Sequence, residues 1–389
     1  MPRASEACIV GIGHTAFTRW GGIQNKSEFD LAFEAVLRAA ADAGLDPAAI
    51  DGFTSFSEDA TDPALLQVAL AAPLLRFSSM VWGGRGGGTC GALAHAVAAV
   101  EGGYADHVVI VRSLCQGQTR RYGHYFDRRP HTNFVAPFGL FAPPQMMALL
   151  VQRYRYEHGL TERQMAAIAL ACRANAQDNP AAVMRGRPLT MEAYLASRMV
   201  AEPFRVPDCC LETDGACAIL VTSWARARDL RQHPVRVLAA AQGSGPHWGS
   251  GPLGSHNMPL ENYGGCNVEV VAEEVFGRAG LRPADISVAQ IYDHFTGLVL
   301  LSLEGFGFCG RGEAGAFVEA GGIDWPDGRL PINTAGGSLS EAYVHGLNLL
   351  IEGVRQMRGQ STRQVKDAQT AFVCGGTGVA PGSAAILAA

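Results

Sequence analysis

Two tyrosines, Tyr292 and Tyr343, each stand two residues before a histidine, His294 and His345, and such pairs are candidates for acid–base chemistry. Tyrosine can exchange protons with alkoxides and enolates, but its free pKa near 10 demands a nearby positive charge or a hydrogen-bond donor, for which Asn333 is a candidate. Residues two apart on a strand share a face, whereas on a helix they diverge. Because Tyr292 follows a strand pattern and Tyr343 a helical one, we expect His294 to assist more than His345.

The sequence has ten cysteines, and none shows Cys-x-x-Cys spacing. Their scatter through a long chain is typical of reduced, buried thiols and not of a disulfide framework or a zinc site. Cys90 and Cys374 lie next to glycine clusters. A nucleophilic mechanism would also require an activating base beside the thiol.

An internal duplication organises the elements that must position these residues. The sequence Ala-Gly-Leu-Asp-Pro-Ala-Ala-Ile at 43–50 returns as Ala-Gly-Leu-Arg-Pro-Ala-Asp-Ile at 279–286. In both places glycine and proline predict the end of a helix. An apolar strand follows each copy, at 52–56 and at 288–292. The two halves are therefore expected to share one architecture.

The same parallel continues downstream of each copy. A glycine cluster precedes an alanine-rich helix at 92–100 and a strand at 107–111, and Gly336-Gly337 precedes a helix at 342–357 and a strand at 370–373. Alternating strands and helices predict parallel βαβ units with helices on both faces of the sheet. We divide the chain into halves 1–230 and 231–389, with an inserted region at about 115–200 that is typical of a lid or binding surface.

Composition excludes several functional classes. The chain has 389 residues, 48% of them hydrophobic, and a net charge of −5. Because no domain of the chain carries an excess of Lys and Arg, binding of nucleic acid is not expected. No apolar run is long enough to span a membrane, and the N-terminus lacks the pattern of a signal peptide. These features predict a large globular enzyme or binding protein of the cytoplasm.

Three sequence blocks, in this order, resemble the thiolase superfamily, and specifically its sterol-carrier-protein and lipid-transfer branch. The resemblance covers most of the chain and implies a duplicated, layered α-β-α-β-α fold. The blocks are Gly86-Gly87-Gly88-Thr89-Cys90-Gly91-Ala92-Leu93, then Tyr292-Asp293-His294-Phe295, and finally Asn333-x-x-Gly336-Gly337 followed by Tyr343-Val344-His345-Gly346.

The chain departs from thiolases at the residues that carry their chemistry. The resemblance places the nucleophilic cysteine at Gly86 and the two catalytic histidines at Tyr292 and Tyr343; Cys90 lies one helical turn late and Cys374 is one residue out of place. This combination resembles the lipid-transfer-type aldolases of bacterial steroid side-chain degradation. It implies retro-aldol cleavage of a bulky β-hydroxyacyl-CoA, with no covalently bound cofactor and no metal. The implied site consists of catalytic Tyr292, Tyr343, His294 and His345, with Asn333, Gly336, Gly337 and Gly376 binding the coenzyme A thioester.

Two alternatives stay open on the sequence. The chain could be a thiolase that uses Cys90 or Cys374, or a non-catalytic subunit that binds acyl-CoA or lipid. The family resemblance also implies a homodimer, and a heterotetramer with a small protein that carries a zinc ribbon and an oligonucleotide-binding-type fold.

Overall fold

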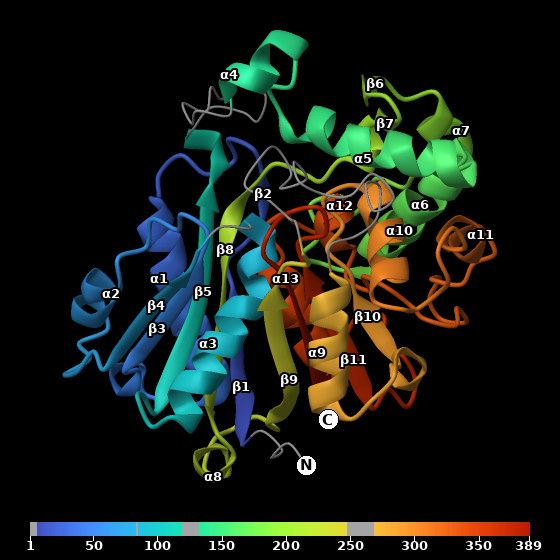
Figure 1. Ribbon diagram of the computed structural model, residues 1–389. Helices are drawn as coiled ribbons and strands as arrows, with labels where there is room; N and C mark the ends of the chain where they lie inside the picture. The colour runs from blue at the N-terminus through green and yellow to red at the C-terminus, as the bar shows by residue number, and fades with distance from the viewer. Residues whose placement is uncertain (1–5, 83–84, 119–131, 247–267) are drawn as a thin grey trace.

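One ten-stranded sheet runs through the computed structural model, which describes residues 6–82, 85–118, 132–246 and 268–389 (Figure 1). Its strands lie in the order β10-β11-β12-β9-β1-β8-β5-β3-β4, and the short β2 pairs with β8. Between β9 and β1 only two residue pairs are matched, Cys8 with Arg236 and Ile9 with Val235. The sheet therefore consists of two half-sheets joined at a narrow seam.

Each half-sheet repeats the pairing pattern of the other. In the N-terminal half, going outward from the seam, β1 pairs antiparallel with β8, β8 antiparallel with β5, and β5 parallel with β3. In the C-terminal half, β9 pairs antiparallel with β12, β12 antiparallel with β11, and β11 parallel with β10. This correspondence confirms the duplication. The strands of the N-terminal half are β1 (Ala7–His14), β2 (Thr18–Arg19), β3 (Gly52–Phe56), β4 (Phe77–Val81), β5 (His107–Cys115) and β8 (Thr213–Ser223). Those of the C-terminal half are β9 (Val235–Gly243), β10 (Val288–Gln290), β11 (Thr370–Gly375) and β12 (Gly382–Ala388).

The prediction of parallel βαβ units was wrong for most of the sheet, in which only β10–β11, β3–β4 and β3–β5 pair in parallel. Parallel strands need a crossover of about a dozen residues, and only six residues, 376–381, connect β11 to β12. Such a short connection permits only an antiparallel return. The predicted division at residues 230 and 231 falls in the connection between β8 and β9, whose strands border the seam on either side.

Two half-sheets and four helices form the five layers of the fold. α3 (Thr89–Glu101) and α13 (Leu347–Met357) each pack against strands of both half-sheets, whereas α1 (Glu28–Ala43) packs against N-terminal strands and α9 (Glu269–Ala279) against β9 and β12. The small residues of α3 suit a helix enclosed between two sheets, because they let both sheets approach closely. The layered α-β-α-β-α prediction is therefore confirmed.

The repeated sequence forms the same helix ending twice. Gly44 and Gly280 take left-handed conformations with φ of 70° and 66°, which glycine adopts without steric cost. The following leucines donate equivalent hydrogen bonds, Leu45 to the Ala40 carbonyl and Leu281 to the Phe276 carbonyl. A single 3₁₀ turn then leads into each strand, so the sequence repeat is also a structural repeat.

The inserted region lies over one end of the sheet, along the top of Figure 1, with α4 left of centre and α5, α6 and α7 to the right. Its helix α6 packs against α10, α11 and α12, which belong to the C-terminal half. The predicted insertion also included residues 119–131, which lie outside the described residues. Its elements are α4 (Thr132–Val135), α5 (Pro143–His158), α6 (Glu162–Asp178), α7 (Met191–Leu195), β6 (Met199–Ala201) and β7 (Phe204–Arg205). The remaining helices are α2 (Pro63–Ala69), α8 (Trp224–Ala227), α10 (Thr296–Gly305), α11 (Ala314–Glu319) and α12 (Gly337–Ser340).

Candidate active site

The hydroxyl groups of Tyr292 and Tyr343 meet in the interior of the C-terminal half. Their oxygens lie 3.0 Å apart and share a hydrogen bond. Only 2% of Tyr292 and 6% of Tyr343 is exposed. Two phenols 51 residues apart in the sequence are thus brought into one hydrogen-bonded pair. Such a pair can pass a proton from one oxygen to the other and is shielded from competing water.

The main chain around Tyr292 is fixed by two neighbouring side chains. Asn333 accepts a hydrogen bond from the Ile291 amide (2.8 Å) and donates one to the Ile291 carbonyl (2.9 Å). Asp293 accepts from the amides of Ser338 (2.7 Å) and Leu339 (3.1 Å) at the start of α12. Tyr292 is therefore anchored on both sides, because the residue before it and the residue after it are each held by two hydrogen bonds.

Tyr343 lies in the turn between α12 and α13, and not on a helix as the sequence predicted. Thr213, from β8 of the other half, accepts from the Tyr343 amide at 3.0 Å and donates to its carbonyl at 2.9 Å. One threonine hydroxyl thereby satisfies both main-chain groups of Tyr343. The pair consequently depends on contact between the two halves.

Space for the Tyr292 ring is left by two glycines. A Cβ on Gly86 would lie 2.0 Å from Cζ and 2.1 Å from the hydroxyl oxygen of Tyr292, well inside van der Waals contact. Gly346, with φ of 86°, approaches the other edge of the ring, where a Cβ would lie 3.0 Å from Cδ2. The space that a side chain at residue 86 would need is therefore occupied by the phenol of Tyr292.

His294 stacks on Tyr292, with ring centroids 4.7 Å apart. Burial lowers the pKa of His294 to about 3, and the Tyr292 main chain opposes this only in part. Neither ring nitrogen has a hydrogen-bond partner with good geometry among the described residues. At neutral pH His294 is thus an uncharged group that can hydrogen-bond, and it supplies no positive charge to a phenolate.

His345 lies against the other tyrosine. Its ring meets the Tyr343 ring edge-on, with centroids 5.1 Å apart. The Nδ1 atom accepts a hydrogen bond from Nε of Arg112 at 3.1 Å, and the carbonyl accepts one from Thr89 at 2.6 Å. The two residues do not diverge as expected, because the turn before α13 replaces the predicted helix. Both sequence-predicted histidines therefore pack against the tyrosine pair.

The four residues expected to bind coenzyme A all make close packing contacts. Both amide atoms of Asn333 are engaged by Ile291, and a Cβ on Gly337 would lie 2.2 Å from Oδ2 of Asp293. Gly336 packs on Ala176 of α6, and Gly376 packs on Gly87. These contacts explain the residue types. A direct contact with coenzyme A stays a prediction.

The two candidate cysteines lie in surroundings that suppress thiolate formation. Cys90 is fully buried, and burial together with the neighbouring Cys374 raises its pKa far above the ordinary range. Burial also raises the pKa of Cys374 to about 12, an effect that hydrogen bonds from the Tyr292 main chain and Ser302 reduce. Because the thiolate is the nucleophilic form, neither side chain is activated for acyl transfer.

Sequence reasoning missed Arg112, Asp59 and Thr213, which support the site from the N-terminal half. Arg112 is a charged residue directly after the apolar run 108–111 of β5, and this was the available signal. Thr213 and Asp59 carry no comparable signal, because their importance comes only from neighbours distant in the sequence.

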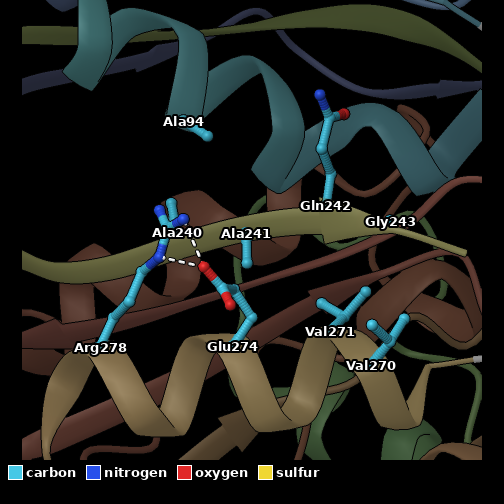
Figure 2. Close-up of a pocket in the computed structure, with 9 residues that line it drawn as sticks. All are labelled: Ala94, Ala240, Ala241, Gln242, Gly243, Val270, Val271, Glu274 and Arg278. Atoms are coloured by element: carbon cyan, nitrogen blue, oxygen red, sulfur yellow. Dashed lines mark hydrogen bonds and ion pairs between the residues drawn. The ribbon is translucent and has the colours of Figure 1, made fainter.

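A surface cavity of about 350 Å³ lies elsewhere, between α3, β9 and α9 (Figure 2). Its lining includes Ala94, Gln242 and Val271, and an ion pair between Glu274 and Arg278 crosses one side. Neither tyrosine lines it, so it is distinct from the candidate site. Within the described ranges, no helix is long and apolar enough to cross a membrane, and no group of three His, Cys, Asp or Glu side chains could hold a metal ion.

The layered duplicated fold, with Gly86 packed against the Tyr292–Tyr343 pair, defines a thiolase-fold protein. Residues 259–388 match the family described as "Thiolase C-terminal domain-like". The chain is 44% identical over 99% of both chains to a 17-hydroxy-3-oxo-4-pregnene-20-carboxyl-CoA lyase of Mycobacterium tuberculosis. It is 40% identical, over 98% of both chains, to a steroid side-chain-cleaving aldolase of Thermomonospora curvata. The solved structure of an "Ltp2-ChsH2(DUF35) aldolase" superposes with a TM-score of 0.91 at 39% identity, covering 99% of this chain and 98% of that one. The chain belongs to the steroid side-chain-cleaving aldolases of the thiolase superfamily.

Proposed function

We propose that this protein is a carbon–carbon lyase that cleaves a β-hydroxyacyl-CoA by a retro-aldol reaction. The observation that carries the proposal is the buried Tyr292–Tyr343 pair. Tyr292 packs against Gly86, the position at which the family resemblance implies the nucleophile of a thiolase. Retro-aldol cleavage needs proton transfers but no covalent intermediate, and a phenol pair without an activated thiol suits that requirement.

The reaction would proceed through two proton transfers. One tyrosine removes the proton of the β-hydroxyl, the Cα–Cβ bond breaks, and the β-carbon becomes a carbonyl. The electron pair of that bond passes to the thioester enolate, and the second tyrosine protonates Cα. Because the two phenols share a hydrogen bond, the proton taken by one can replace the proton given by the other. The pair then finishes with its original number of protons, and no water or redox partner is consumed.

A steroid side-chain thioester is the substrate class we propose. The name of the mycobacterial relative places a hydroxyl on carbon 17 and the carboxyl-CoA on carbon 20. These carbons are bonded in a steroid, so such a compound is a β-hydroxyacyl-CoA. Cleavage would release a 17-keto steroid and a shortened acyl-CoA. The acyl-CoA substrate and the free thiols of the described cysteines also support a cytoplasmic location.

A turnover measurement tests this function against its two alternatives. Purified protein, with and without a DUF35-type partner, is given the 17-hydroxy steroid thioester, and products are separated by mass spectrometry. We expect a ketone and a shortened acyl-CoA in equal amounts. Release that depends on free coenzyme A would instead identify a thiolase, and binding without any products would identify a non-catalytic subunit.

Replacing Cys90 with alanine should leave turnover within several-fold of the wild type. The thiol is fully buried, its Sγ faces the Val373 carbonyl at 3.5 Å, and its loss creates a small cavity that costs about 1 kcal/mol of stability. Steady-state kinetics and a thermal melt check both parts. A thousand-fold loss of turnover in a folded variant would refute the aldolase mechanism and favour the thiolase alternative.

We also propose that the chain works in complex with a small DUF35-type protein, which carries a zinc ribbon and an oligonucleotide-binding-type fold. The name of the aldolase structure that matches over nearly the full chain includes such a partner. The two chains would form a heterotetramer built on a homodimer of the present chain. Co-expression and mass measurement of the purified complex test this composition.

The outer edge of β4 is the surface we propose for the homodimer. β4 is the last strand in the sheet order, and it exposes 47% of Met80 and 92% of Trp82, which follows it. An edge strand that exposes large apolar side chains is normally paired or covered. A second copy of the chain, related by a twofold axis, would cover both residues in each protomer.

Changing Met80 to aspartate should therefore convert the dimer into a monomer. Around a twofold axis each copy contributes one new carboxylate, and facing like charges cost several kcal/mol. Light scattering would show the mass falling from twice 41.1 kDa to one chain. Tyr156→Asp, at an 84% exposed position on α5, is the matched control and should keep the dimer. A monomeric wild-type chain would contradict the proposal.

A further inference from the structure

Arg112 is a buried charge whose guanidinium is held through Nε and one terminal nitrogen. The residue belongs to β5 and is 4% exposed. One terminal nitrogen donates to the Phe56 carbonyl at 2.9 Å and to Asp59 Oδ2 at 3.2 Å, and the guanidinium lies 5.5 Å from the centre of the Phe56 ring. These contacts fix the group, and its Nε–H then donates to Nδ1 of His345 at 3.1 Å.

This last hydrogen bond determines the state of His345. An arginine Nε is always protonated and can only donate, so Nδ1 must be the acceptor. The ring is then neutral and carries its proton on Nε2. If His345 were protonated, its Nδ1–H would face the Nε–H of Arg112, and a second positive charge would lie beside the guanidinium. Among the contacts seen in the described part of the chain, the ionisable groups that face the ring include Arg112 from β5 and Tyr343 from its own turn, with Asp59 behind the guanidinium.

The backbone on both sides of this contact is held in an unusual conformation. Ser57 and Glu58 have φ of 54° and 57°, and they return the chain so that Asp59 reaches Arg112. His345 has φ of 49°. Non-glycine residues in this left-handed region cost about 1 kcal/mol or more each, and persist where surrounding contacts enforce them. Three such residues around one guanidinium indicate that the contact is specifically built.

We propose that Arg112 is a positioning residue that holds His345 neutral, as an Nε2–H donor, beside Tyr343. His345 then remains a hydrogen-bond donor at every working pH and never competes with the tyrosines for protons. The Arg112–Asp59 pair lies behind it and makes no contact with substrate in this scheme. The predicted effect of Arg112 on turnover rests on the proposed function, but the predicted effect of Arg112 on His345 protonation does not.

Histidine hydrogen–deuterium exchange measured by mass spectrometry tests the protonation directly, without any activity. The Arg112→Met variant should protonate His345 at a higher pH than the wild type, whereas His95, which lies outside the site, should be unchanged. Asp59→Asn keeps the Arg112 donor and should leave His345 as in the wild type. An identical His345 titration in Arg112→Met and wild type would overturn the proposal, whether or not the protein cleaves any thioester.

A double-mutant cycle with His345→Gln tests whether Arg112 acts through His345. Arg112→Met should lose turnover by about 10- to 100-fold, the cost of removing the hydrogen-bond partner behind a functional histidine in metal sites. In Arg112→Met, kcat/KM should also fall at acid pH, because His345 becomes protonated there. Arg112→Lys should show little of this fall, and the double variant, which has no His345, should show none. The double variant should lose no more than His345→Gln alone.

Losses that multiply in the double variant would show that Arg112 acts independently, and would overturn the proposal. Arg76→Met is the matched control, because Arg76 pairs with Asp51 and Asp106 away from the tyrosines. It should change neither the pH profile nor the His345 titration. Thermal melts of all variants confirm that each is folded at the assay temperature.

Discussion

Replacing either Tyr292 or Tyr343 with phenylalanine should lower turnover by about 10² to 10⁴-fold, the usual contribution of general acid–base catalysis. Phenylalanine keeps the ring and its packing, and removes only the oxygen of a hydroxyl pair separated by 3.0 Å. Stability should change by no more than about 1 kcal/mol, the net value of one hydrogen bond. Single-turnover kinetics with the steroid thioester measure the loss at the chemical step, and substrate affinity should change little.

Tyr194→Phe is the matched control for the tyrosine variants. Tyr194 is also fully buried, and its hydroxyl donates to Asp208 at 2.8 Å in the inserted region. Its replacement should lower stability and leave the chemical step intact. If both site variants cleave substrate at wild-type rates, the tyrosines are packing residues and the proposed mechanism is wrong. If only one matters, His294 or a water molecule must carry the other proton.

Adding a side chain at Gly86 should abolish aldolase activity without creating a thiolase. In Gly86→Ala or Gly86→Cys the new Cβ would lie 2.0 Å from Cζ of Tyr292, so the ring must move. Overpacking of this kind costs about 1 to 3 kcal/mol, and displacing the hydroxyl removes the acid–base contribution of about 10² to 10⁴-fold. The new thiol gains no activity, because no histidine stands at positions 292 and 343 to activate it.

Gly277→Ala provides the control for a glycine substitution by itself. Gly277 lies in α9, and a Cβ there would have no atom within 4 Å. Alanine should therefore stabilise the helix by about 0.5 to 1 kcal/mol and leave turnover unchanged. A Gly86→Ala enzyme with normal kinetics would mean that Tyr292 does not need its observed position, and would remove the main support for its catalytic role.

The sequence was sufficient for the parts of this protein that depend on local pattern. The repeated Ala-Gly-Leu-x-Pro phrase predicted two equivalent helix endings, because a glycine in the left-handed region and a following proline stop a helix wherever they occur. The ordered motifs predicted the layered fold and the family. They also predicted that Gly86, Tyr292 and Tyr343 stand at the positions of the thiolase residues.

Tertiary structure decided whatever depends on distance, burial and connection length. The six residues between β11 and β12 force an antiparallel return, and a turn replaces the helix expected around Tyr343. Burial holds the pKa of His294 at about 3, so it cannot carry the charge that its residue type suggests. Arg112 reaches His345 across 233 positions in the sequence. A side chain's charge and partner depend on the groups that folding places around it, and these groups come mostly from distant segments.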